Sequence, residues 1–185
     1  AATNLAPNDT NAARDIFVYD RTSKAVERVS VSSSGTEGND VSDQPTISDD
    51  GRNVAFISFA DNLVSSDNNN ASDVFLRNLD TKETRLVSAS KDGRAGNMRS
   101  DWPSVSGDGR FVAFMSNASD LVPGDINNTT DVFVNDMLTG DIKIVSRNSV
   151  GAIGNGASGF PSISKDGRFI TYQSNATNLT ADTLN

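Results

Sequence analysis

Short apolar runs separated by turn residues make up the whole chain, and no segment shows the 3.6-residue spacing of a helix. In the stretch 103–160, four strands are predicted, at 103–106, 111–116, 131–136 and 142–146. Tight turns at 107–110 and 138–141 join the first strand to the second and the third to the fourth, and their glycines permit a positive φ. Evenly spaced short strands with turn signals predict an all-β fold.

The same pattern returns every 58 residues. Three features repeat at this spacing: a proline, an Asp-Gly-Arg turn and a Gly-Asn pair. They stand at Pro45, Pro103 and Pro161, at 50–52, 108–110 and 166–168, and at 38–39, 96–97 and 154–155. The Ala-Thr-Asn-Leu segment at 2–5 also matches 176–179, so the two ends of the chain overlap in the repeat.

Four antiparallel strands per repeat correspond to one blade of a β-propeller. We therefore expect one propeller segment over 1–185, with three blades of four strands. Whole blades are expected at 45–102 and 103–160. The third blade is split across the ends, with its outer strands within 1–44, at 15–20 and 25–30, and its inner strands within 161–185, at 161–164 and 169–174.

Three blades do not close a ring, because propellers have four to eight blades. An unclosed array leaves exposed sheet edges and apolar blade faces. Two explanations stay open. Either two chains form a homodimer with a six-bladed ring, of which this chain is half, or the chain is part of a longer protein that supplies the remaining blades.

An acidic loop precedes the third strand of every repeat, and we call the segments 9–15, 67–73 and 125–131 the acidic loops. They should emerge beside the mouth of the central channel. Loop positions 1, 3 and 7 carry side-chain oxygens that suit calcium. These candidate ligands are Asp9, Asn11, Asp15, Asp67, Asn69, Asp73, Asp125, Asn127 and Asp131. The alternative is that the Asn and Asp side chains only form Asx-turns.

The residues before the repeated prolines differ where their neighbours repeat: Gln44, Trp102 and Phe160. They should lie at equivalent places near the channel mouth. An exposed aromatic ring there can stack on a sugar or anchor a partner protein. Packing between blades is the alternative. The arginines of the Asp-Gly-Arg turns, Arg52, Arg110 and Arg168, are expected to brace neighbouring blades through carboxylates.

The charge balance narrows the choice of partner. Asp and Glu number 24 against 16 Lys and Arg, a net charge of −8, which argues against nucleic acid or an anionic membrane surface. No apolar run reaches membrane-span length.

The chain has neither histidine nor cysteine, so the commonest general base and thiolate chemistry are missing. We therefore expect no enzyme activity.

Residues 103–116, Pro-Ser-Val-Ser-Gly-Asp-Gly-Arg-Phe-Val-Ala-Phe-Met-Ser, followed by Asp-Val-Phe-Val-Asn-Asp at 131–136, resemble the TolB-like β-propeller repeat. The resemblance implies an often six-bladed propeller on the exported side of a bacterial cell, periplasmic or extracellular. It also implies protein binding or scaffolding rather than chemistry. Two features depart from the family pattern. Ile47, Val105 and Ile163 replace its inner-strand tryptophan, and the Asn- and Asp-rich loop is longer.

Three functions follow from these observations. The first is a non-catalytic propeller module that binds a protein or a glycan through the channel-mouth face, with calcium stabilising its loops. The second is the propeller portion of a larger exported hydrolase. The third is a lectin that stacks sugars on Trp102 and Phe160.

Overall fold

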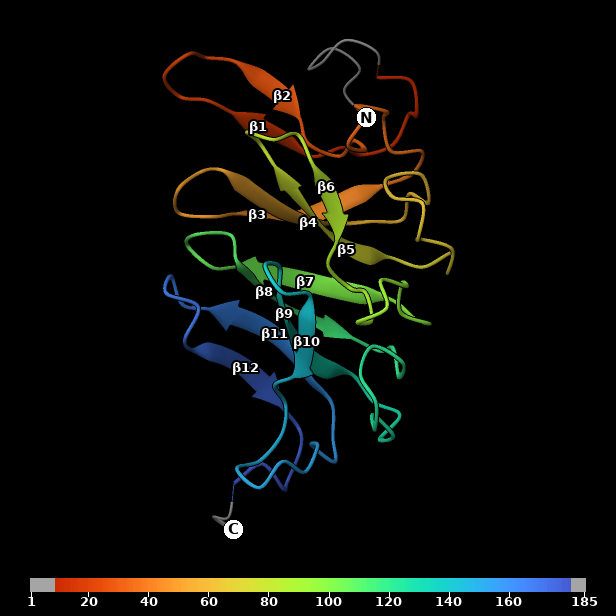
Figure 1. The fold of residues 1–185 in the computed structure, drawn as a ribbon, viewed down its shortest axis with the longest axis vertical. Coiled ribbons are helices and arrows are strands. Elements are labelled where there is room, and N and C mark those ends of the chain that lie inside the picture. Colours follow the sequence, from red (N-terminus) through yellow and green to blue (C-terminus); the bar gives the residue numbers. More distant parts are fainter. Residues whose placement is uncertain (1–8, 181–185) are drawn as a thin grey trace.

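The computed structural model describes residues 9–180, and within this range every regular element is a strand. The strands form four antiparallel sheets that follow one another along the long axis of the molecule (Figure 1). The strands are β1 (Phe17–Tyr19), β2 (Val26–Arg28), β3 (Ser42–Ile47), β4 (Asn53–Ser58), β5 (Asp73–Asn78), β6 (Thr84–Leu86), β7 (Ser100–Val105), β8 (Phe111–Ser116), β9 (Asp131–Asp136), β10 (Asp141–Ile144), β11 (Ser158–Ile163) and β12 (Ile170–Ser174). The all-β prediction is confirmed.

Two of the sheets are complete four-stranded meanders, with the orders β3-β4-β5-β6 and β7-β8-β9-β10. The predicted second and third strands of the middle repeat match β8 and β9 residue for residue. The predicted first strand was wrong at its start, because β7 begins at Ser100 and runs through Pro103. Its register with β8 shifts between Asp101 and Ser104. Proline is tolerated at such a bulge, where the ladder needs no N–H donor.

The other two sheets have two strands each, β1–β2 and β11–β12. They lie at opposite ends of the stack (Figure 1). By the 58-residue repeat, β11–β12 is an inner pair and β1–β2 is an outer pair. The repeated segment 2–5 lies outside the described residues. Among the residues 9–180, no helix has the length and hydrophobicity to cross a membrane.

The core lies between successive sheets and is built from the second and third strands of each repeat. Phe56 on β4 stacks on Phe75 on β5, with ring centroids 5.8 Å apart, and Phe114 on β8 stacks on Phe133 on β9 at 5.7 Å. All four rings are fully buried. Burying one such side chain contributes about 1.5–3 kcal/mol. The same aromatic pair therefore anchors each complete sheet.

The hydrogen bond from a serine hydroxyl to the turn aspartate repeats in all three Asp-Gly-Arg turns. In the middle copy the Ser106 hydroxyl donates to Asp108 Oδ1 at 2.7 Å, and Gly109 has a φ of 74°. The expectation that the arginines brace neighbouring blades was wrong for two of them. Arg110 pairs with Asp136 at the end of β9, and Arg52 pairs with Asp80 in the turn after β5, because the second and third strands of one blade are direct neighbours.

Candidate functional site

The last aspartate of each acidic loop is part of the fold's own hydrogen-bond network. Asp73 is completely buried, and its Oδ1 accepts a 2.5 Å hydrogen bond from the Ser88 hydroxyl. The same hydroxyl accepts from the Val74 N–H at 3.0 Å. Asp131 and Ser146 repeat this arrangement in the next copy. The carboxylate therefore joins the start of the third strand to the serine two residues after the end of the fourth.

The asparagine at loop position 3 uses both ends of its amide. Asn69 Nδ2 donates to Asp73 Oδ2 at 2.6 Å and to the Gly96 carbonyl at 2.7 Å. Its Oδ1 accepts from the Ala71 N–H at 2.8 Å, which is an Asx-turn. Asn127 makes the equivalent bonds. A cation at these two loops would therefore depend on the carboxylate oxygens, since the amide oxygens already hold the turn.

The aspartates at positions 1 and 7 are close enough to repel each other. Burial raises the pKa of Asp67 to about 6. Burial, with the charge of Asp67 added, raises the pKa of Asp73 to about 7. The pKa of Asp125 is raised by burial and by Asp131, whose own pKa is also raised by burial. Each of these loops therefore holds two carboxylates whose charged forms are disfavoured, and a bound cation would relieve that penalty.

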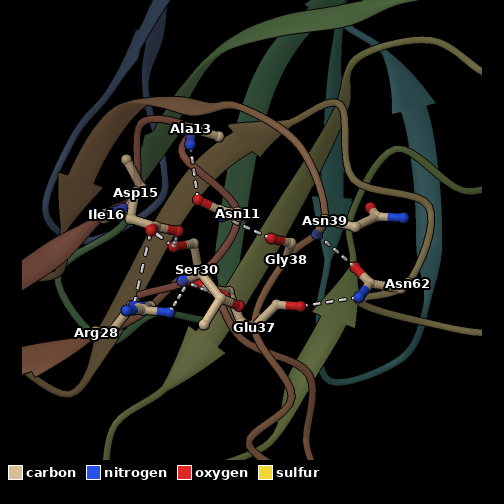
Figure 2. A network of polar contacts seen from close by, with 11 residues as sticks. Asn11, Ala13, Asp15, Ile16, Arg28, Ser30, Glu37, Gly38, Asn39 and Asn62 are labelled. Carbon is tan, nitrogen blue, oxygen red and sulfur yellow. Dashed lines mark hydrogen bonds and ion pairs between the residues drawn. The ribbon is translucent and has the colours of Figure 1, made fainter. Parts of the chain in front are cut away.

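The first acidic loop differs, because it gains a third carboxylate. Asp9, Asp15 and Glu37 each offer an oxygen, and these oxygens all lie within 4.8 Å of one another. Asp9 Oδ1 and Asp15 Oδ2 are buried and accept no hydrogen bond from the described part of the chain. Asn11 points its amide away from this cluster, donating to the Gly38 carbonyl at 2.8 Å (Figure 2).

Arg28 contacts the same cluster, pairing with Glu37 and lying 3.7 Å from Asp15 (Figure 2). Burial alone would raise the pKa of Glu37, but hydrogen bonds from Thr10 and the Arg28 charge lower it overall. In the other two copies the position of Arg28 is taken by Leu86 or Ile144, and that of Glu37 by Ala95 or Ile153. One repeat therefore replaces an apolar pair with a charged pair.

Sequence reasoning missed Glu37 as a member of this cluster. The available signal was its place in the repeat, where the other copies are apolar. A charged residue at a position that is otherwise apolar indicates a local function or a local partner.

Gln44, Trp102 and Phe160 are brought together on the three inner strands β3, β7 and β11, and we call them the inner-strand ladder. The backbone N–H of Trp102 donates to Gln44 Oε1 at 2.7 Å. The Trp102 and Phe160 rings meet edge to face, with centroids 5.1 Å apart and an interplanar angle of 63°. Both rings remain about half exposed, at 46% and 51%. The ladder is thus an ordered surface as well as a contact between sheets.

The backbone of the ladder is held in an uncommon conformation. Gln44, Trp102 and Phe160 have φ values of 52°, 53° and 54°. A residue before proline normally adopts an extended conformation, and a non-glycine residue in this region costs of the order of 1–3 kcal/mol. The bulge of each inner strand falls at this residue and its proline. Beside Phe160 lies a cavity of about 180 Å³ lined by Met115 and Gln173, among others.

No protein-family model matches the chain, and no curated protein matches its sequence. Solved structures do match its fold. A putative TolB from Agrobacterium tumefaciens is 22% identical, with 86% of this chain and 50% of that chain covered and a TM-score of 0.51. The tricorn protease is 15% identical, with 89% and 13% covered and a TM-score of 0.54. The fold is a TolB-like β-propeller.

Prolyl endopeptidase structures match the propeller in the same way, at 13% identity and a TM-score of 0.53, over 86% of this chain and 22% of theirs. The propeller segment spans half or less of each of these proteins. At such identities the likeness concerns the fold, and it confirms the fold that the repeat predicted.

Proposed function

We propose that this propeller segment is a non-catalytic binding or scaffold module, which captures a partner protein or a glycan on the inner-strand ladder. The observation that carries the proposal is the ladder itself. Its backbone is identical in three repeats, while its side chains change from amide to indole to phenyl. Residues that build the blades repeat in type, so variation at one strained and exposed position favours recognition over folding.

The chemistry of the ladder suits an amphipathic ligand. Trp102 and Phe160 offer apolar surface to a ligand. Their mutual contact already restricts the rotation of both side chains, so binding has less entropy to lose. Gln44 adds an amide beside them, and the inner strands of a propeller line its central channel. The resemblance to TolB-like repeats supports a periplasmic or extracellular setting and a six-bladed ring, completed by a second chain or by the rest of a longer one.

Calcium binding belongs to the same proposal. The candidate that fits best is the Asp9, Asp15 and Glu37 cluster, because it combines three carboxylates with two buried oxygens that accept no hydrogen bond from residues 9–180. The pairs Asp67 with Asp73 and Asp125 with Asp131 offer fewer oxygens. Calcium would hold the loops of the channel-mouth face in place.

One alternative has an observation in its favour. Two of the similar structures are named as peptidases, the tricorn protease and prolyl endopeptidase. The propeller would then be the non-catalytic portion of a larger hydrolase. The intact mass of the source protein separates the two functions, because a hydrolase requires a further domain.

The ladder can be tested with its own reporter, since Trp102 is the single tryptophan of the chain. A glycan array and a displayed-peptide library supply ligands, and Trp102 fluorescence measures their affinity in solution. We expect Phe160→Ala to weaken binding about tenfold or more, with the fold intact by circular dichroism. Ligands whose affinity is unchanged in both Trp102→Ala, measured by calorimetry, and Phe160→Ala would refute the proposal.

Calcium is tested by the melting temperature in chelator and in millimolar calcium. We expect calcium to raise it, and Asp9→Asn to remove most of that increase. A melting temperature that does not respond to calcium would refute metal binding. It would leave the proposal for the inner-strand ladder unaffected.

A further inference from the structure

A cavity of about 200 Å³ opens beside the second acidic loop, and we call it the loop cavity. Its wall comes from the connection before β3, from the turn after β4 and from the acidic loop itself. The lining residues are Asn39, Asp40, Phe59, Asp61, Asp67, Asn70 and Ala71. Among the described residues, no lysine or arginine lines it, so its charge is entirely negative.

The three carboxylates of the loop cavity have no cationic partner in the described part of the chain. Asp40, Asp61 and Asp67 form no ion pair within residues 9–180. Asp67 is the most buried of them, at 7% exposure, and no side chain of that range donates to it. Burial, with the charge of Asp61 added, raises its pKa to about 6. A cation in the cavity would offset this cost.

The groups that give the cavity its character are specific to this copy of the repeat. The equivalents of Asp40, Phe59 and Asp61 are Met98, Asn117 and Ser119 in the next copy and Gly156, Asn175 and Thr177 in the last. Two carboxylates and one aromatic ring have thus come together in one cavity, at positions that are uncharged and not aromatic elsewhere. Since the other copies form the same loops without them, these three side chains indicate a ligand rather than a folding role.

The aromatic ring selects the kind of cation. Phe59 is 49% exposed, whereas its equivalent Asn117 accepts a 3.0 Å hydrogen bond from the Thr130 hydroxyl. The face of a phenyl ring attracts an organic cation. Calcium and magnesium bind through oxygen atoms, and a phenyl ring supplies none. The ring therefore favours an organic cation over a metal ion in this cavity.

Hydrogen bonds hold the loops of the cavity in place. Asn39 Nδ2 donates to Asp61 Oδ1 at 2.7 Å, and the Asn39 backbone N–H donates to Asn62 Oδ1 at 3.0 Å (Figure 2). Asp40 Oδ1 accepts from the Val41 N–H at 2.6 Å. Each bond uses one carboxylate oxygen and leaves the second without a donor from residues 9–180. The acceptors are therefore already positioned for a ligand.

The molecule holds a cation between a ring and a carboxylate elsewhere in the fold. Arg110 donates from Nε and Nη2 to the two oxygens of Asp136, at 3.0 and 2.7 Å. Its guanidinium carbon also lies 4.8 Å from the centroid of the Phe111 ring. A guanidinium suits both contacts because it is planar, stacks on a ring and donates two parallel hydrogen bonds, whereas the ammonium group of lysine is a point charge.

We propose that the loop cavity binds an arginine side chain of a partner protein, with the guanidinium stacked on Phe59 and hydrogen-bonded to Asp61, beside the buried Asp67. The net charge of −8 favours the approach of a basic partner. The inference rests on the proposed binding function in one respect, since it requires a protein partner. It uses a different surface from the inner-strand ladder.

The test uses the 185-residue chain in chelator, with acetylated and amidated tripeptides that carry arginine, citrulline or lysine between two glycines. Citrulline has the shape of arginine without its charge. We expect calorimetry to show the arginine peptide binding about tenfold tighter than either of the others. Phe59→Asn and Asp61→Ser reproduce side chains of the next copy, so the fold should stay intact and each should weaken arginine binding about tenfold.

Two control variants separate this site from net charge and from the ladder. Asp92→Asn removes one charge at an exposed carboxylate outside the cavity and should leave the affinity unchanged. Trp102→Ala should also leave it unchanged, so failure of the ladder and failure of the loop cavity are distinguishable. No binding of the arginine peptide, equal affinity for the citrulline or lysine peptide, or equal losses in Asp92→Asn and Asp61→Ser would overturn the proposal.

Discussion

Replacing Asp67 by asparagine should stabilise the protein at neutral pH in calcium-free buffer. Asp67 is buried in its acidic loop, and its oxygen accepts a hydrogen bond from the backbone N–H of Asn69. The amide oxygen of asparagine can accept the same bond, so Asp67→Asn removes the charge and keeps the shape. The substitution therefore isolates the cost of a buried charge next to Asp73.

The magnitude follows from the pKa. The pKa of Asp67 rises from 3.8 to about 6, because burial penalises the carboxylate. One unit corresponds to about 1.4 kcal/mol, so ionised Asp67 costs the folded state at most about 3 kcal/mol. Partial relaxation of the loop reduces this to about 1–3 kcal/mol. For a chain of this size that is a rise in melting temperature of roughly 3 to 10 °C.

The sign depends on pH. The folded protein holds the Asp67 proton more tightly than the unfolded chain does, so its stability increases as pH falls from above 6 towards 3.8. The advantage of Asp67→Asn should thus be largest at pH 8 and disappear near pH 4. Asp73 shifts in the same direction, with a pKa of about 7, and it strengthens the trend in the unmutated protein.

The assay is urea unfolding at pH 4, 6 and 8 in the presence of chelator. Asp92→Asn, at a highly exposed carboxylate, is the matched control and should leave stability unchanged within about 0.5 kcal/mol. An Asp67→Asn variant that is less stable than the unmutated protein at pH 8, or whose gain does not shrink at pH 4, would show that the carboxylate is not a destabilising buried charge.

Two further predictions each have a matched comparison within the chain. Arg28→Leu alone should lower the free energy of unfolding by about 3–5 kcal/mol, because it leaves Glu37 and Asp15 without their guanidinium. Arg28→Leu with Glu37→Ala reproduces the Leu86 and Ala95 pair and should lower it by less than the single change. Changes in the free energy of unfolding that simply add would contradict this expectation. Gly109→Ala should destabilise by about 2–4 kcal/mol, since a Cβ there would lie 2.1 Å from Asn53 Nδ2 at a φ of 74°. Gly140→Ala, at a φ of 73° in open space, should cost only about 1–2 kcal/mol, and equal losses in calorimetric melting would contradict the clash.

The fold could be predicted because its determinants are local and repeated. The Asp-Gly-Arg turn is held by bonds between residues two to five apart, such as Ser106 to Asp108 and Phe111 to Ser106. The strands between the turns alternate in polarity, and the 58-residue period gives three independent readings of one pattern. Interactions between residues this close in the sequence can be predicted from the sequence alone.

Only part of the candidate metal site could be predicted from the sequence. Asp9 and Asp15 stand in the acidic loop itself, but Glu37 reaches them from a connection more than twenty residues later. The Asn11 amide likewise finds the Gly38 carbonyl 27 residues away, so spacing along the loop did not show that the amide is engaged.

The sequence by itself determined the all-β architecture, the number of repeats and the acidic loops, because each depends on neighbours within one repeat. Tertiary structure alone decided the contacts between repeats. It placed the bulges that turn Trp102 and Phe160 towards each other, and it kept Arg110 within its own sheet. These features depend on how sheets stack and where a strand ends, which no spacing along a single chain specifies.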